Sequence, residues 1–149
     1  MDDYKRAYED VNLDVIKNNV DIIMKRTKPG TKALIVVKAD AYGHGDVPVA
    51  RALESRADYF AVATGPEAIN LRENGITKPI LILGFVAYEE YEDLINNDVD
   101  LVIFDKESAD ALSEAAKKIG KTAKCHVKVD TGMRRIGVEP VKESVEIVK

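Results

Sequence analysis

Short apolar runs rich in β-branched residues recur along this chain, and they constrain its fold more than any other feature of the sequence. The runs are residues 33–38, 59–63, 79–84, 101–104 and 124–130. Near-continuous apolar character is what a strand covered on both faces requires, as in a parallel sheet. The sequence therefore predicts about five buried, parallel strands.

The segments between these runs carry helical patterns. Residues 12–27 repeat apolar side chains at the spacing of one helical face. Thr64 and Glu67 have the spacing of a capping box, and Asp105 is suited to be the N-cap of a helix that Gly120 would end. Strands and helices thus alternate, which is the rhythm of the βα unit.

This alternation predicts an α/β fold, and the chain length leaves two architectures open. A (β/α)8 barrel typically takes about 250 residues, whereas this chain has 149. The strands could form an open parallel sheet, or a (β/α)8 TIM-type barrel truncated before closure. No linker-like stretch interrupts the sequence, so residues 1–149 are expected to form one domain. A further helix is expected from Glu139 through Val148.

The composition argues against several classes of function. The net charge is −4 with both signs interleaved and without a Lys/Arg run, so no nucleic-acid partner is expected. No apolar run approaches the roughly 18 residues of a membrane span, and the charged start lacks the core of a signal peptide. No side-chain spacing suggests a metal site. Cys125 is the only cysteine, which favours a cytoplasmic protein. We expect it to be a small core residue on the helix-facing side of its strand.

The segment VVKADAYGHG joins a lysine at the end of a strand to a glycine-containing turn. Alternation along the strand places Lys38 on the same face as Leu34 and Val36, where poor solvation of the ammonium favours Schiff-base chemistry. The turn after Tyr42 leads into a helix near Asp46, and a helix N-terminus is a natural anion site. The pattern fits a pyridoxal phosphate site, but it also fits a lysine that marks where a strand emerges into water.

The segment HVKVDTGMRRIG forms the end of the last predicted strand and the loop after it. His126, Lys128 and Asp130 alternate onto one face. Three ionisable groups on an inner face are costly unless paired, so they indicate function in a central strand and a solvated face in an edge strand. Arg134 and Arg135 follow in the loop, where a guanidinium can meet an anionic oxygen.

Both segments resemble one known family. VVKADAYGHG resembles the pyridoxal phosphate attachment site of alanine racemases, and HVKVDTGMRRIG resembles their K-x-D-(T/S)-G-M-x-R-x-G segment. The similarity extends over essentially the whole chain. It implies the N-terminal portion of the family's (β/α)8 barrel, pyridoxal 5'-phosphate as cofactor, and interconversion of L- and D-alanine, which supplies D-alanine for peptidoglycan. It also implies a homodimer, with a C-terminal β domain that lies outside these residues.

The resemblance also implies roles for individual residues. Lys38 would hold the cofactor as a Schiff base and act as one of two catalytic bases, and Tyr42 would contact the cofactor phosphate. Lys128 would match a lysine that is often carbamylated and that orients Arg135. Arg135 would bind the phenolic oxygen of the cofactor and help place the substrate carboxylate. Arg134 departs from the small or polar residue usual in the family and puts an extra cation beside Arg135.

Several expectations concern the isolated chain. The second base and most of the phosphate cradle would lie outside it, so we expect the 149-residue chain alone to be inactive and to self-associate through its open edge. Two alternatives remain open from the sequence. One is a broad-specificity or serine racemase on the same barrel, and the other is a non-catalytic α/β module.

Overall fold

The sheet of this protein is parallel, and its strands lie side by side in the order in which they occur in the sequence. The computed structural model describes residues 8–141 and 144. Its strands are β1 Leu34–Val36, β2 Tyr59–Val62, β3 Ile80–Ile82, β4 Val99–Ile103 and β5 Cys125–Val127. Each strand pairs in parallel with the next. The prediction of five parallel strands is confirmed, although the observed strands are shorter than the apolar runs.

The strand order decides between the two architectures. In a doubly wound open sheet, the order reverses at a switch point. Here it runs β1-β2-β3-β4-β5 without reversal. That order, with a helix after each of the first four strands, is the arrangement of the first βα units of a (β/α)8 barrel. The chain therefore forms a partial barrel.

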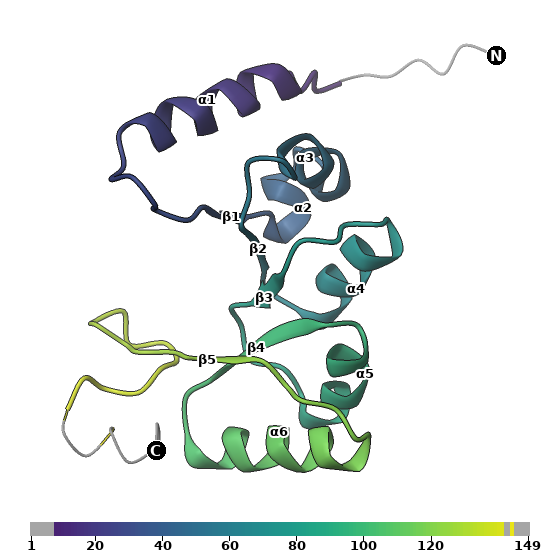
Figure 1. The fold of residues 1–149 in the computed structure, drawn as a ribbon, viewed down its shortest axis with the longest axis vertical. Helices are drawn as coiled ribbons and strands as arrows, with labels where there is room; N and C mark the ends of the chain where they lie inside the picture. Colours follow the sequence, from purple (N-terminus) through teal and green to yellow (C-terminus); the bar gives the residue numbers. More distant parts are fainter. Residues whose placement is uncertain (1–7, 142–143, 145–149) are drawn as a thin grey trace.

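Helices cover one face of this sheet. In Figure 1, the helices between the strands lie on one side of the sheet, and the loop after β5 extends to the other side. The helical elements are α1 Leu13–Lys25, α2 Lys38–Tyr42, α3 Asp46–Leu53, α4 Gly65–Glu73, the 3-10 turn η1 Tyr88–Glu90, α5 Tyr91–Asn96 and α6 Lys106–Lys118. The helix expected from Glu139 onward lies mostly outside the described residues.

The helix starts follow the capping patterns of the sequence. Asn12 Oδ1 accepts the N–H groups of Asp14 and Val15 at 3.0 and 3.1 Å. The Asp105 carboxylate accepts the N–H of Ser108 at 2.7 Å. These bonds satisfy donors that have no partner within the helix, so the predicted starts of α1 and α6 are confirmed.

The two faces of the sheet differ in what they bury. On the helix-facing side, Phe60, Ile80 and Leu101 belong to the main hydrophobic core and are almost fully buried. Because side chains alternate along a strand, the residues between them point to the opposite face. That face carries Leu81, which is buried, and the carboxylate residue Asp100, which is only 2% exposed. In a barrel this second face is the interior.

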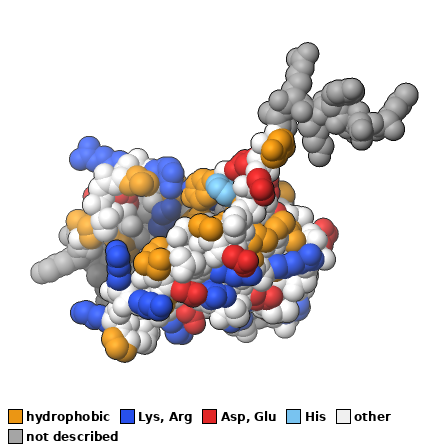
Figure 2. Space-filling view, turned by 90° about the horizontal axis from the view of Figure 1, so that it is seen from above, with side chains coloured by type: hydrophobic (Ala, Val, Ile, Leu, Met, Phe, Trp, Pro, Cys, Tyr) orange, Lys and Arg blue, Asp and Glu red, His pale blue; other side chains and the backbone are white. Residues whose placement is uncertain are grey.

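The surface is mixed in character. Figure 2 shows acidic, basic and apolar side chains interspersed over the face seen from above. No helix among the described residues is long and apolar enough to cross a membrane.

Candidate active site

The predicted site residues lie at the carboxyl ends of β1 and β5. Lys38 lies two residues after the end of β1, and Lys128 directly follows β5. In barrels of this kind, the carboxyl ends of the strands carry the functional groups. The expectation that Lys38 belongs to the strand is wrong, because β1 ends at Val36 and Lys38 is the first residue of α2.

The reason for this early end is a left-handed turn. Ala39, Asp40, Ala41 and Tyr42 have φ angles of 52°, 55°, 50° and 58°. A left-handed backbone costs about 1–2 kcal/mol for each residue that has a Cβ atom. Four such residues in succession persist only where the surrounding structure holds them. The residues after Lys38 therefore form a strained element rather than an ordinary helix.

Hydrogen bonds within the turn and to α3 hold part of it. The Ala41 N–H donates to the Val37 carbonyl at 3.0 Å, and the Gly45 N–H donates to the Asp40 carbonyl at 2.9 Å. The Asp40 Oδ1 atom accepts the N–H of Asp46, the first residue of α3, at 2.9 Å. Side-chain and backbone acceptors thus join the turn to the start of the next helix.

The expected anion site at the start of α3 is wrong. The N–H of Asp46 donates to Asp40, and the N–H of Val47 donates to the Asp46 carboxylate at 2.6 Å. Two carboxylates therefore occupy the donors that a phosphate would need. They also repel an anion, so this helix start is not suited to bind one.

Glu67 contacts the turn from the other side. Its Oε1 atom accepts the N–H of Ala39 at 2.8 Å, and its Oε2 atom accepts the N–H groups of Ala63 and Thr64 at 2.7 and 3.2 Å. The sequence pattern identified Glu67 only as part of a capping box at the start of α4. The bond to Ala39 had no sequence signal, because it joins residues that are far apart in the chain.

Lys128 lies in a polar but poorly solvated position. Its Nζ atom donates to the carbonyl of Leu83 at 3.1 Å. Burial lowers the pKa of Lys128, the nearby Arg135 guanidinium and Lys38 lower it further, and Asp130 opposes them. Lys38 and Arg135 thus lie close enough to Lys128 for their charges to act on its pKa.

Asp130 organises the loop that carries the two arginines. Its carboxylate accepts the N–H groups of Gly132, Arg134 and Arg135 at 2.8, 3.0 and 3.0 Å. These backbone donors, with that of Arg134 first, lower the pKa of Asp130. Because the loop uses this carboxylate, Asp130 holds the backbone of the arginines rather than neutralising their side chains.

The lysines and arginines of the predicted site have no carboxylate partner in the described structure. In the part of the chain that the structure describes, no carboxylate forms an ion pair with Lys38, Lys128, Arg134 or Arg135. Tyr42 is 63% exposed, and Arg134 and Arg135 are exposed as well. The carboxyl end of the sheet thus offers several cationic side chains without an ion-pair partner in the described structure, and these are suited to an anionic ligand.

A second polar cluster lies on the inner face of the sheet, nearer the amino ends of the strands. The Tyr59 hydroxyl donates to Asp100 Oδ2 at 2.9 Å, and His126 Nε2 lies 3.5 Å from the same oxygen. The rings of Tyr59 and His126 meet edge to face at 5.8 Å. His126 therefore points inward, as its place in the strand predicts. Asp100 was missed because the apolar run in the sequence begins at residue 101, whereas β4 begins at Val99.

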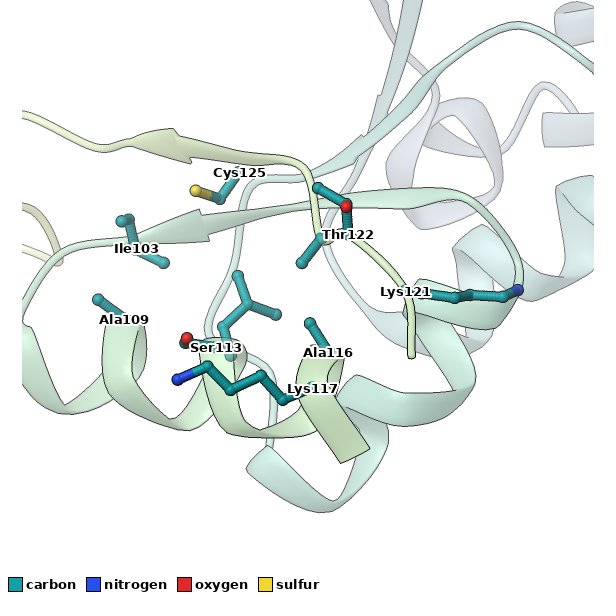
Figure 3. A pocket seen from close by; sticks show the side chains of 10 residues that line it. Ile103, Ala109, Ser113, Ala116, Lys117, Lys121, Thr122 and Cys125 are labelled. Carbon is teal, nitrogen blue, oxygen red and sulfur yellow. The ribbon is translucent and has the colours of Figure 1, made fainter. Parts of the chain in front are cut away.

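Cys125 corrects another expectation. It lies on the helix-facing side of β5, as predicted, and lines a groove with residues of α6, among them Ala109 and Ala116 (Figure 3). It is exposed rather than buried, because no helix among the described residues covers the outer face of β5. This groove lies on the opposite side of the sheet from the inward-pointing His126.

Comparison with known proteins gives a consistent result. Residues 11–149 match the family described as "Alanine racemase, N-terminal domain". The alanine racemase of Methanococcus maripaludis is 46% identical over 143 residues, which are 95% of this chain and 38% of that protein. Alanine racemase 2 of Oceanobacillus iheyensis is 43% identical, over 98% of this chain and 38% of its own length.

Solved structures agree with these matches. An alanine racemase of Clostridium difficile 630 superposes with a TM-score of 0.85 at 45% identity, over 92% of this chain and 35% of that one. The alanine racemase of Bacillus anthracis with bound L-Ala-P has a TM-score of 0.81 at 40% identity, over 91% and 35%. The chain thus spans less than two fifths of the length of the relatives it matches.

Proposed function

This chain belongs to the alanine racemase family, and we propose that it forms the N-terminal part of a pyridoxal phosphate-dependent racemase that interconverts L- and D-alanine. The observation that carries the proposal is the position of Lys38 and Lys128 after β1 and β5, at the carboxyl end of a parallel barrel sheet, with Arg135 in the loop that Asp130 holds. The relatives that cover most of this chain are named alanine racemase.

The charge of the site fits the proposed cofactor. Pyridoxal phosphate carries a phosphate and a phenolic oxygen, both anionic, and it binds covalently to a lysine amine. Lys38 offers that amine, and Arg135 offers a guanidinium suited to an anionic oxygen. Asp130 is bonded to the loop backbone, so it leaves this positive charge available. We assign the phosphate contact to Tyr42.

The protein's residues would act on a proton at Cα. The bound cofactor supplies an electron sink that makes the Cα–H bond acidic. The Lys38 amine would remove or return the proton on one face of the substrate, while Arg135 helps place the substrate carboxylate. Inversion needs a second base on the opposite face. We expect that base from a partner subunit in a homodimer, so the isolated 149-residue chain should not racemise alanine.

Lys128 is the proposed site of carbamylation. The lowered pKa of Lys128 increases the fraction of neutral amine, which is the form that adds carbon dioxide and releases one proton. The product is a carbamate anion beside Arg135. It would replace a cation with an acceptor for the guanidinium and so orient Arg135.

We place the enzyme in the cytoplasm, where it would supply D-alanine for peptidoglycan.

A labelling experiment tests the proposed site. The protein is incubated with pyridoxal phosphate, reduced with borohydride and mapped by mass spectrometry. We expect the label on Lys38 and its loss in Lys38→Ala. Lys106→Ala is the matched control, because Lys106 is exposed and pairs with Asp110 on the same helix.

Label spread over surface lysines, or no label, would favour a non-catalytic module instead. Interconversion of L- and D-alanine by the whole protein, followed by chiral chromatography, tests the reaction itself. Faster racemisation of serine or of other amino acids than of alanine would favour the broad-specificity alternative.

A further inference from the structure

We propose that Glu67 is a positioning residue for Lys38, acting through the left-handed turn that follows this lysine. The inference rests on the proposed role of Lys38 in the racemase. Glu67 lies in α4, at the third position of the helix, and reaches the turn from the neighbouring βα unit.

The geometry exceeds what helix capping requires. A capping box needs one bond from the carboxylate to the N-cap backbone, and Glu67 makes that bond to the Thr64 N–H at 3.2 Å. Its other oxygen makes a shorter bond, 2.8 Å, to the N–H of Ala39. This N–H belongs to the peptide bond that joins Lys38 to Ala39. The carboxylate thus fixes the peptide plane next to the lysine.

The same carboxylate ties this peptide to the end of β2. Glu67 Oε2 accepts the N–H of Ala63, the residue after the last residue of β2, at 2.7 Å. One side chain therefore bridges the carboxyl ends of β1 and β2 through main-chain donors. Hydrogen bonds to an ionised acceptor are short and about twice as strong as neutral ones. The bridge fixes the position of the Lys38 backbone along the direction of the neighbouring strand.

The strain of the turn explains why this bridge matters. Ala39 has a φ of 52°, and an alanine favours the right-handed region when nothing opposes it. If Ala39 relaxed to a negative φ, the Lys38–Ala39 peptide would rotate and its N–H would leave Glu67. The Lys38 side chain would then start from a different backbone direction. Glu67 opposes this rotation, because its Oε1 atom holds the Ala39 N–H in the observed left-handed form.

The substitution Glu67→Gln tests the proposal with little change in shape. Glutamine keeps one acceptor oxygen and turns an NH2 group toward the other donors, so the bridge cannot be complete. Glu54→Gln is the matched control. Glu54 also accepts a backbone N–H from a distant residue, that of Thr77 at 3.0 Å, and in the described structure its side-chain hydrogen bonds go to Thr77 rather than to the turn.

Three quantities are measured on the whole protein: the thermal midpoint, the rate of borohydride-trapped attachment of pyridoxal phosphate to Lys38 with its pH profile, and the hydrogen exchange of the Ala39 amide. We expect both variants to lose stability. Only E67Q should slow attachment, by about tenfold to a hundredfold, shift its pH profile and speed exchange at Ala39. The attachment rate and the exchange rate of each variant are compared after correction to equal folded fractions.

The outcomes separate this inference from the proposed function. If Lys38 of the unchanged protein takes no label, the proposed function fails. If it takes the label and E67Q reacts at the unchanged rate, Glu67 is only a helix cap and the inference is wrong. Equal slowing in E67Q and E54Q would also overturn it, because a general loss of stability would then explain both.

Discussion

The hydrogen bond between Tyr59 and Asp100 allows a quantitative test of how the inner face of the sheet is held. It links β2 to β4 across the strand between them. We consider Tyr59→Phe, Asp100→Ala and the double variant. Phenylalanine removes only the hydroxyl donor, and alanine removes the acceptor.

The single variants do not give the strength of this bond. Asp100→Ala breaks it but also removes a carboxylate that is only 2% exposed, which recovers the cost of burying a charge. His126 contributes little, because it lies 3.5 Å away and its side chain is 45% exposed. The coupling between the two substitutions cancels these separate effects. For a bond to a charged acceptor, we expect a coupling of about 1.5–3 kcal/mol.

Urea unfolding of the four proteins at neutral pH measures this coupling. A second measurement uses the Tyr59 hydroxyl. Its hydrogen bond to Asp100 raises its pKa, and burial raises the pKa to a smaller extent. In Asp100→Ala, NMR of ring-labelled tyrosine should show the pKa of Tyr59 closer to its ordinary value. A coupling below about 0.5 kcal/mol, the usual error of additivity, would refute the reasoning.

Three further predictions concern other parts of the chain. Gly84→Ala should cost about 1–3 kcal/mol in urea unfolding, because a Cβ there would lie 2.3 Å from the Ala63 carbonyl oxygen. The pKa of Asp21 is lowered by its bonds from Arg56, so this pair stabilises the fold above the ordinary carboxyl pKa. The advantage over Asp21→Asn should vanish as pH falls through the folded pKa, which urea midpoints between about pH 6 and pH 3 would show. With 13C-bicarbonate, a carbamate signal should grow as pH rises and be absent in Lys128→Arg.

Much of the fold could be predicted from local pattern. Runs of β-branched residues identified all five strands, and side chains such as Thr64 and Asp105 identified helix starts, because these signals act within a few residues. Local pattern alone did not decide the architecture, since 149 residues suit either an open sheet or part of a barrel; the family resemblance predicted the partial barrel. That choice depends on which strands pair, and pairing is a long-range property.

The errors at the site have the same origin. Alternation predicted the face of Cys125 correctly, but burial depends on which elements cover that face. The strand was extended to Lys38, because nothing in the alanines that follow indicates a left-handed turn. Ala39 takes its conformation from contacts with distant groups, above all the Glu67 carboxylate. Local propensity is therefore overruled where the chain approaches the proposed chemistry.

Carboxylates have an unexpected role in this site. Asp40, Glu67 and Asp130 each accept backbone N–H groups of the segments that follow β1 and β5. A carboxylate bonded to the main chain stabilises the loop that it joins. The same residues that make the turn and the loop rigid therefore leave Lys38 and Arg135 without ion-pair partners in the described structure. Loops held by hydrogen bonds and unpaired cations therefore occur together in the described structure, and both favour an anionic cofactor bound in one orientation.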